Sequence, residues 1–112
     1  MVAAVDDRRI FERFPARFPA KFRHSRHDYG TNVFLRDASA DGIRLMTKER
    51  LFLNDSVSLE VELPDGHDPL VLNGEVVWSR SATNDLWDVG LRFHKINLMQ
   101  MRRMYSVVNN NP

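Results

Sequence analysis

The chain contains no cysteine among its 112 residues. This absence excludes disulfide bonds, thiolate metal ligands and a cysteine nucleophile, and it agrees with a cytoplasmic protein. Long apolar runs are also missing, since no stretch approaches the roughly 20 residues that a membrane-spanning helix needs. The first residues lack the basic and apolar segments of a secretory signal. We therefore expect a cytoplasmic protein with a single domain, which is what a chain of this length can form.

Catalytic and metal-binding motifs are lacking as well. The sequence has no Gly-x-Ser-x-Gly, no glycine-rich phosphate loop and no motif of paired carboxylates. His24 and His27 are close in sequence, but no third ligand lies within local reach, so solvated histidines are a better interpretation than a metal site. We predict no enzyme activity, no metal and no cofactor.

The net charge is only +1, but it is unevenly distributed along the chain. Through Arg26 there are seven basic residues against three acidic ones, and after it nine against twelve. An anion would therefore meet the N-terminal region first. Most of the basic residues there are arginines, whose planar guanidinium binds phosphate in a fork and stacks on aromatic rings. A general polynucleotide-binding domain would more often carry a basic excess over its whole surface.

Short segments of alternating apolar and polar residues predict β-strands over most of the chain after residue 13. Ser56–Leu63 is the clearest, because its odd-numbered residues are apolar over the whole length. The other predicted strands lie at about 20–25, 31–38, 43–47, 70–80 and 86–94. Asn73-Gly74 interrupts the longest of them and suggests a β-bulge there. Regularly spaced short strands are typical of an all-β fold, here a small antiparallel β-barrel.

One helix is predicted at the C-terminal end. Apolar residues recur at helical spacing after Asn97, which is suited to be an N-cap, and they are Leu98, Met101, Tyr105 and Val108. We expect this helix to cover one end of the barrel. The chain is thus divided into a flexible arginine-rich arm at 1–13, a barrel with its helix at 14–108 and a polar tail at 109–112.

Two polar clusters stand out from this pattern. The first is the arginine group of the arm, Arg8-Arg9 and Arg13. The second is Asp37-Ala38-Ser39-Ala40-Asp41-Gly42, a polar turn between two apolar runs, where short side chains can meet a ligand. Each has a simpler explanation when taken alone, because a run of arginines is often only solvated and Asp, Ser and Gly suit any turn.

The order and spacing of these clusters resemble those of a PilZ domain, the bacterial receptor module for cyclic di-GMP. The resemblance rests on Arg8-Arg9-x-x-x-Arg13, on Asp37-x-Ser39-x-x-Gly42, and on the later runs Gly74–Trp78 and Val89–Phe93. It extends from Arg8 to about Val108. It implies a six-stranded antiparallel β-barrel with a C-terminal helix, an arginine arm that folds over the nucleotide, and an Asp/Ser/Gly turn that meets the nucleotide from the barrel.

The resemblance also assigns roles to the arginines of the arm. Arg9 and Arg13 would bind phosphate oxygens or the O6 and N7 acceptors of guanine. Arg8 would offer a further stacking platform. Arg17 departs from the family pattern, because it creates a second pair of arginines at the same spacing and leaves the register of the arm open.

The residues of the turn have matching roles. Asp37 would accept hydrogen bonds from the guanine edge or orient an arginine, and the Ser39 hydroxyl would reach a base edge or a phosphate. Gly42 would let the backbone approach the ligand closely. Trp78 and Arg80 are further candidates for the wall of the ligand site, with a core aromatic as an equally good interpretation of Trp78.

These residues support three functional hypotheses. The first is a cyclic di-GMP receptor whose arm becomes ordered on nucleotide binding and thereby changes its interaction with a partner protein. The second is a PilZ-like protein-interaction domain that does not bind nucleotide. The third is a small β-barrel that binds single-stranded nucleic acid by stacking bases on aromatic side chains. We rank it last, because most aromatic residues occupy positions expected to face the core.

Overall fold

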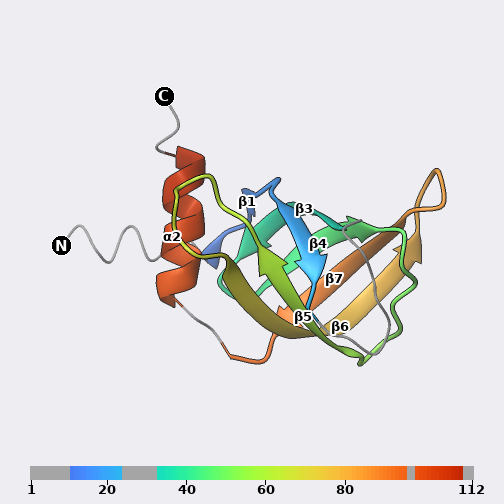
Figure 1. Ribbon diagram of the computed structural model, residues 1–112. Helices are drawn as coiled ribbons and strands as arrows, with labels where there is room; N and C mark the ends of the chain where they lie inside the picture. The colour runs from blue at the N-terminus through green and yellow to red at the C-terminus, as the bar shows by residue number, and fades with distance from the viewer. Residues whose placement is uncertain (1–10, 24–32, 96–97, 110–112) are drawn as a thin grey trace.

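The structure is a computed structural model that describes residues 11–23, 33–95 and 98–109. These residues form seven strands and one long helix (Figure 1). The elements are β1 (Phe14–Pro15), β2 (Pro19–Phe22), β3 (Val33–Ser39), β4 (Gly42–Thr47), β5 (Ser56–Val61), β6 (Leu70–Ser81), β7 (Trp87–Phe93) and α2 (Leu98–Asn109). None of the described helices is long and apolar enough to cross a membrane.

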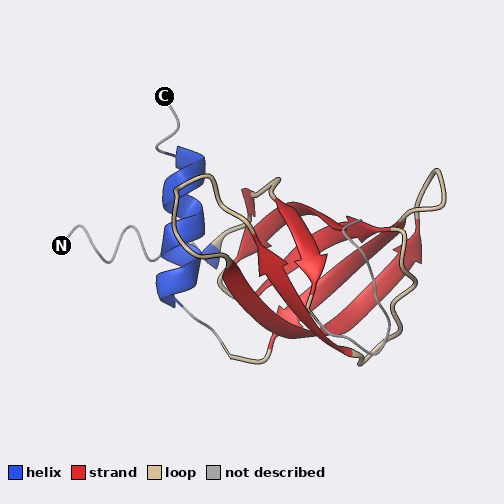
Figure 2. Ribbon diagram, in the orientation of Figure 1, coloured by secondary structure: helices blue, strands red, loops and turns tan. Residues whose placement is uncertain are grey.

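The strands form one antiparallel sheet that closes on itself. Their order is β1-β3-β2-β5-β6-β7-β4, and a further pairing of β3 with β4 closes the ring. The predicted six-stranded antiparallel barrel with a C-terminal helix is therefore confirmed, with the two-residue β1 as an extra strand paired to β3. Figure 2 shows the strands wrapped into the barrel and α2 lying across one end of it.

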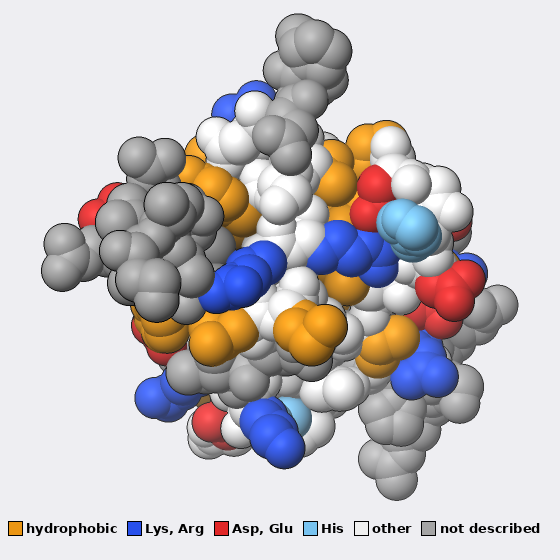
Figure 3. Space-filling view, turned by 90° about the vertical axis from the view of Figure 1, so that its left-hand side faces the viewer, with side chains coloured by type: hydrophobic (Ala, Val, Ile, Leu, Met, Phe, Trp, Pro, Cys, Tyr) orange, Lys and Arg blue, Asp and Glu red, His pale blue; other side chains and the backbone are white. Residues whose placement is uncertain are grey.

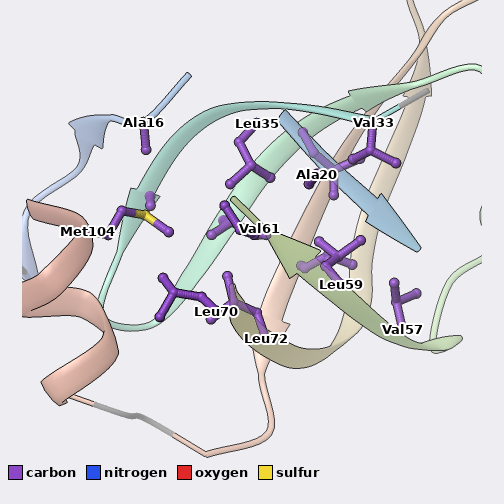
Figure 4. Packing of buried hydrophobic residues seen from close by; sticks show 14 of the residues in the cluster. Ala16, Ala20, Val33, Leu35, Val57, Leu59, Val61, Leu70, Leu72 and Met104 are labelled. Carbon is purple, nitrogen blue, oxygen red and sulfur yellow. The ribbon is translucent and has the colours of Figure 1, made fainter. Parts of the chain in front are cut away.

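The core fills the barrel and continues under α2. On β5 the alternation places Val57, Leu59 and Val61 inside, at 7% exposure or less. Met101 and Met104 are the buried residues of α2, and Met104 reaches toward the barrel interior (Figure 4). The helix is therefore held by the apolar surface that it buries rather than by its own propensity.

Two β-bulges interrupt the ladders of the described strands, and neither is at Asn73-Gly74. The pairing register shifts between Leu35 and Asp37 in β3 and between Val76 and Trp78 in β6. The predicted bulge at Asn73-Gly74 is wrong, because both residues pair regularly with β5. Gly74 serves close strand packing instead, since a Cβ there would lie 2.6 Å from the carbonyl oxygen of Arg92.

Several predictions fall on residues that the structure does not describe. They concern Arg8, Arg9, His24, His27 and Asn97. Of the predicted arm, the structure describes residues 11–13.

Candidate functional site

The strand register brings most of the predicted site residues to one outer face of the barrel. Residues directly opposite each other on paired strands lie on the same face, so the register defines rows across β3, β4, β7 and β6. The rows are Phe34–Met46–Asp88–Arg80, Asp37–Arg44–Gly90–Trp78 and Ser39–Gly42–Arg92–Glu75. All five predicted site residues of the barrel, Asp37, Ser39, Gly42, Trp78 and Arg80, belong to these three adjacent rows, which we call the site face.

The two bulges are what turn Asp37 and Trp78 outward. Unbroken alternation from the buried residues Leu35 and Val76 would place both on the inner face. Each bulge contains one extra residue, Arg36 in β3 and Val77 in β6. The extra residue shifts the alternation of side chains by one position, so the residues after it that would point inward point outward instead. Trp78 is therefore half-buried on the outside of the barrel and is not a core aromatic.

Arg13 joins the site face through Asp37. Its Nη1 donates a hydrogen bond to Oδ1 of Asp37, and Nη1 of Arg44 lies 3.6 Å from the other carboxylate oxygen. Asp37 thus lies between two guanidinium groups. Both oxygens of Asp37 are therefore directed at arginines.

A second carboxylate, Asp88, lies beneath the same face. It forms a bidentate pair with Arg44, with Nε to Oδ1 at 2.9 Å and Nη2 to Oδ2 at 3.0 Å. Nε and Nη2 of Arg80 both donate to Oδ2, at 3.1 and 3.0 Å. The hydrogen bonds from Arg44, followed by those from Arg80, lower the pKa of Asp88 in spite of its burial. Asp88 therefore remains a carboxylate and binds both arginines.

Trp78 and Arg80 lie against each other at the far end of this network. The guanidinium carbon of Arg80 is 5.3 Å from the centroid of the Trp78 ring, which is cation–π distance. The indole lies over Gly90, where a Cβ would come within 2.2 Å of its Nε1. The half-buried Trp78 ring thus lies between Gly90 and the guanidinium of Arg80, beside the charged residues.

The turn residues Ser39 and Gly42 have structural roles of their own. The Ser39 hydroxyl accepts a hydrogen bond of 3.3 Å from the amide of Asp41, within the turn. At Gly42 a Cβ would lie 2.1 Å from the carbonyl oxygen of Leu91. Close packing of β4 on β7 therefore requires glycine there, whether or not a ligand approaches.

An open hollow connects the turn to Arg13. Its volume is about 460 Å³. Its lining residues are Phe11, Arg13, Ser39, Asp41, Gly42, Val77, Leu91 and Arg92. The chain before β1 and the site face thus border the same hollow.

A larger hollow, of about 850 Å³, lies beside α2 and contains none of the predicted site residues. It is lined by Arg17 and Phe18, by the Pro64–His67 region and by α2, where Arg103 pairs with Asp65 at 2.7 and 2.9 Å. Figure 3 views the molecule from the α2 side and shows basic side chains there among apolar ones. Arg13 and Arg17 therefore belong to different hollows, and Arg17 lines the one without predicted site residues.

A family model for the PilZ domain matches residues 7–109. The chain belongs to the PilZ domain family. Members of this family act as receptor and adaptor modules in cyclic di-GMP signalling rather than as enzymes.

A solved structure shares the fold of this PilZ domain. It is the inhibitor of motility (MotI/DgrA) of Bacillus subtilis, with a TM-score of 0.63 and 13% sequence identity. The match covers 88% of this chain and 48% of that protein, so the PilZ domain spans about half the length of that neighbour. No curated protein matches the chain.

Three residues that contact the predicted site residues were not themselves predicted as site residues from the sequence: Arg44, Asp88 and Gly90. Their side chains or backbone hold Asp37, Arg80 and Trp78 in place. Gly90 lies in the run Val89–Phe93 on which the family resemblance partly rests, and Asp88 stands out as an acid between the apolar residues Trp87 and Val89 of a predicted strand. Its partners lie on β4 and β6, so recognising them would have required the register of three strands.

Proposed function

We propose that this PilZ domain is a cytoplasmic receptor for cyclic di-GMP that binds the nucleotide on the site face. The observation that carries the proposal is the continuous network from Arg13 through Asp37, Arg44 and Asp88 to Arg80. It joins the arginine motif, the Asp/Ser/Gly turn and the Trp78 ring on one side of the barrel. No enzyme activity is part of this proposal.

The chemistry of the network matches that of the ligand. Its three arginines outnumber its two aspartates, so the cluster retains one positive charge for the phosphates. Guanidinium groups bind phosphate oxygens in a fork, and they bind the O6 and N7 of guanine in the same way. The Trp78 ring is half-buried on the outside of the barrel, and with Arg80 beside it, it is the candidate for stacking against a base. Arg8 and Arg9 would add further cations from the arm.

The proposed mechanism is a shift in the population of arm conformations. A nucleotide that touches both the arm and the barrel binds only the state in which the arm is folded over the site face, so binding favours that state. The surface that this region offers to a partner protein then changes. Arg13 already lies on Asp37, and the nucleotide would extend this contact toward residues 8–12.

Isothermal titration with cyclic di-GMP tests the proposal, with linear pGpG and GTP as control ligands. We expect saturable binding of the cyclic dinucleotide alone. Arg13→Ala should weaken binding about ten- to hundredfold, because it removes charge-assisted hydrogen bonds. Arg17→Ala is the matched control, because Arg17 lines the other hollow. Equal binding by Arg13→Ala and the parent would refute the assignment.

A second candidate is a protein-interaction domain that does not bind nucleotide. It is favoured by the structural roles of the turn residues, since Asp37 already pairs with two arginines and Gly42 is required by the packing of β4 on β7. A chain could keep both residues for its fold alone. Absence of heat in the titration, together with no binding by a second method, would support this candidate.

A further inference from the structure

Asp88 connects the Arg13–Asp37–Arg44 group of the site face to the Arg80–Trp78 pair. It is 3% exposed, whereas its partners extend into solvent, with side chains 34% exposed for Arg44 and 68% for Arg80. The carboxylate therefore holds two guanidinium groups from below. Through Arg44 it is linked to Asp37 and Arg13, and through Arg80 to Trp78.

We propose that Asp88 is a positioning residue of the nucleotide site: it fixes Arg80 and Arg44 in their binding orientations before the ligand arrives. This inference rests on the proposed function and assigns a role within the same site. Asp88 lies outside both the arginine motif and the Asp/Ser/Gly turn.

The geometry at Arg80 explains why an anchor is needed. A long, exposed arginine loses side-chain entropy when a ligand immobilises it, and that loss weakens binding. Both Nε and Nη2 of Arg80 are bound to one oxygen of Asp88. Its Nη1 has no hydrogen-bond partner among the residues that the structure describes. The side chain is thus ordered in advance while it keeps a donor for an incoming acceptor.

Gly90 completes the arrangement, two residues after Asp88 on the same strand. Its lack of a side chain admits the Trp78 indole, and Arg80 lies 5.3 Å from that ring. β7 thus fixes the aromatic surface through Gly90 and the bordering cation through Asp88. The distance between the Trp78 ring and the Arg80 guanidinium is therefore fixed, because residues of one strand hold both.

Asp88→Asn tests the inference, because it keeps the volume of the side chain and removes the charge. We expect cyclic di-GMP affinity to fall about tenfold, since the arginines lose their charge-assisted anchor. Asp65→Asn is the matched control. It removes the carboxylate from an equally bidentate pair, with Arg103, that lies in the other hollow, and should leave the affinity unchanged.

A second readout separates positioning from a role in stability alone. In NMR spectra of the unliganded protein, the Arg80 Nε–H resonance should be sharp and slow to exchange with solvent in the parent. In Asp88→Asn the same proton should exchange rapidly with solvent, because the side chain is no longer held. If Asp88→Asn lowers only the unfolding midpoint and binds nucleotide like the parent well below that midpoint, the inference is wrong. Should this variant fail to fold, Asp88→Glu keeps the charge but displaces it, and should show the same loss of affinity; parent-like binding by Asp88→Glu would then overturn the inference.

The same experiments distinguish the inference from the proposed function. Absence of nucleotide binding by the parent protein would overturn both. Binding by the parent that is unchanged in Asp88→Asn would overturn only the role of Asp88.

Discussion

At the scale of single residues, two glycines of the site face prevent different collisions. A Cβ at Gly90 would meet the side chain of Trp78, whereas a Cβ at Gly42 would meet the backbone carbonyl oxygen of Leu91. An indole can turn away, but a paired strand cannot move without breaking its ladder. The two positions therefore differ in what substitution should cost.

We expect Gly90→Ala to cost about 1 kcal/mol of unfolding free energy and Gly42→Ala about 3 kcal/mol, within the range seen for overpacked sites. Urea unfolding measures both. In a Trp87→Phe background, the fluorescence of Trp78 should change in Gly90→Ala because the indole is displaced. A stability cost at Gly90 as large as that at Gly42 would show that Trp78 cannot move.

The ionisation of Asp88 should also be visible in the pH dependence of stability. Its pKa is lowered below the ordinary 3.8, chiefly by the hydrogen bonds from Arg44. A lowered pKa in the folded state contributes stability that is complete above the ordinary pKa and is lost as the pH falls through the lowered value. Asp88→Asn should therefore be less stable than the parent by about 1–3 kcal/mol at neutral pH.

The two proteins should converge in stability as the pH falls from 3.8 through the lowered pKa of Asp88, because the unfolded parent takes up the proton first and the folded parent does so only below the lowered value. Denaturant midpoints measured from neutral pH to about pH 2 test this. A difference that stays constant over the whole range would mean that the charge of Asp88 contributes nothing to the stability of the fold.

At the scale of elements, α2 is attached to the barrel through a narrow apolar face. Met101 and Met104 are at most 1% exposed, whereas Met99 is 83% exposed. Met104→Ala should destabilise the domain by about 2–4 kcal/mol, because it removes buried surface and leaves a cavity. Met99→Ala is the matched control, because it makes the same substitution on the same helix, and its unfolding free energy should stay within about 0.5 kcal/mol of that of the parent. Similar losses from both variants, by urea unfolding, would argue against this attachment.

The strands were predictable from the sequence because alternation is a local property, as at Val57, Leu59 and Val61. The bulges were not, since they depend on residues distant in the chain. Just before the β6 bulge, the backbone of Val76 exchanges hydrogen bonds of 2.8 and 3.0 Å with Asn54 and Asp55. Alternation alone would place Trp78 in the core, so the site face was predictable from the motif residues but not from the strand pattern.

At the scale of the whole molecule, three arginines and two aspartates are gathered on one side of the barrel. Asp37 and Asp88 neutralise part of the charge of Arg13, Arg44 and Arg80, and they keep the three guanidinium groups close together. Three unpaired arginines at this distance would repel one another. The paired network keeps a single positive excess, so the site should favour a compact dianion over a long polynucleotide.

This arrangement predicts where cyclic di-GMP changes the molecule and where it does not. Ion pairs and strand pairing among β3, β4, β6 and β7 already hold the barrel residues of the site in place, so a bound nucleotide should order them little further. Hydrogen exchange should show gained protection at residues 8–13 and at the turn from Ser39 to Gly42, with little change in β2 and β5 on the remaining part of the barrel. Arg13→Ala should abolish the gain at residues 8–12, because it removes the link between arm and barrel, whereas Arg17→Ala should preserve it. Protection confined to the hollow beside α2 would instead place the nucleotide against Arg17 and Arg103, and the site face would then lose its assignment.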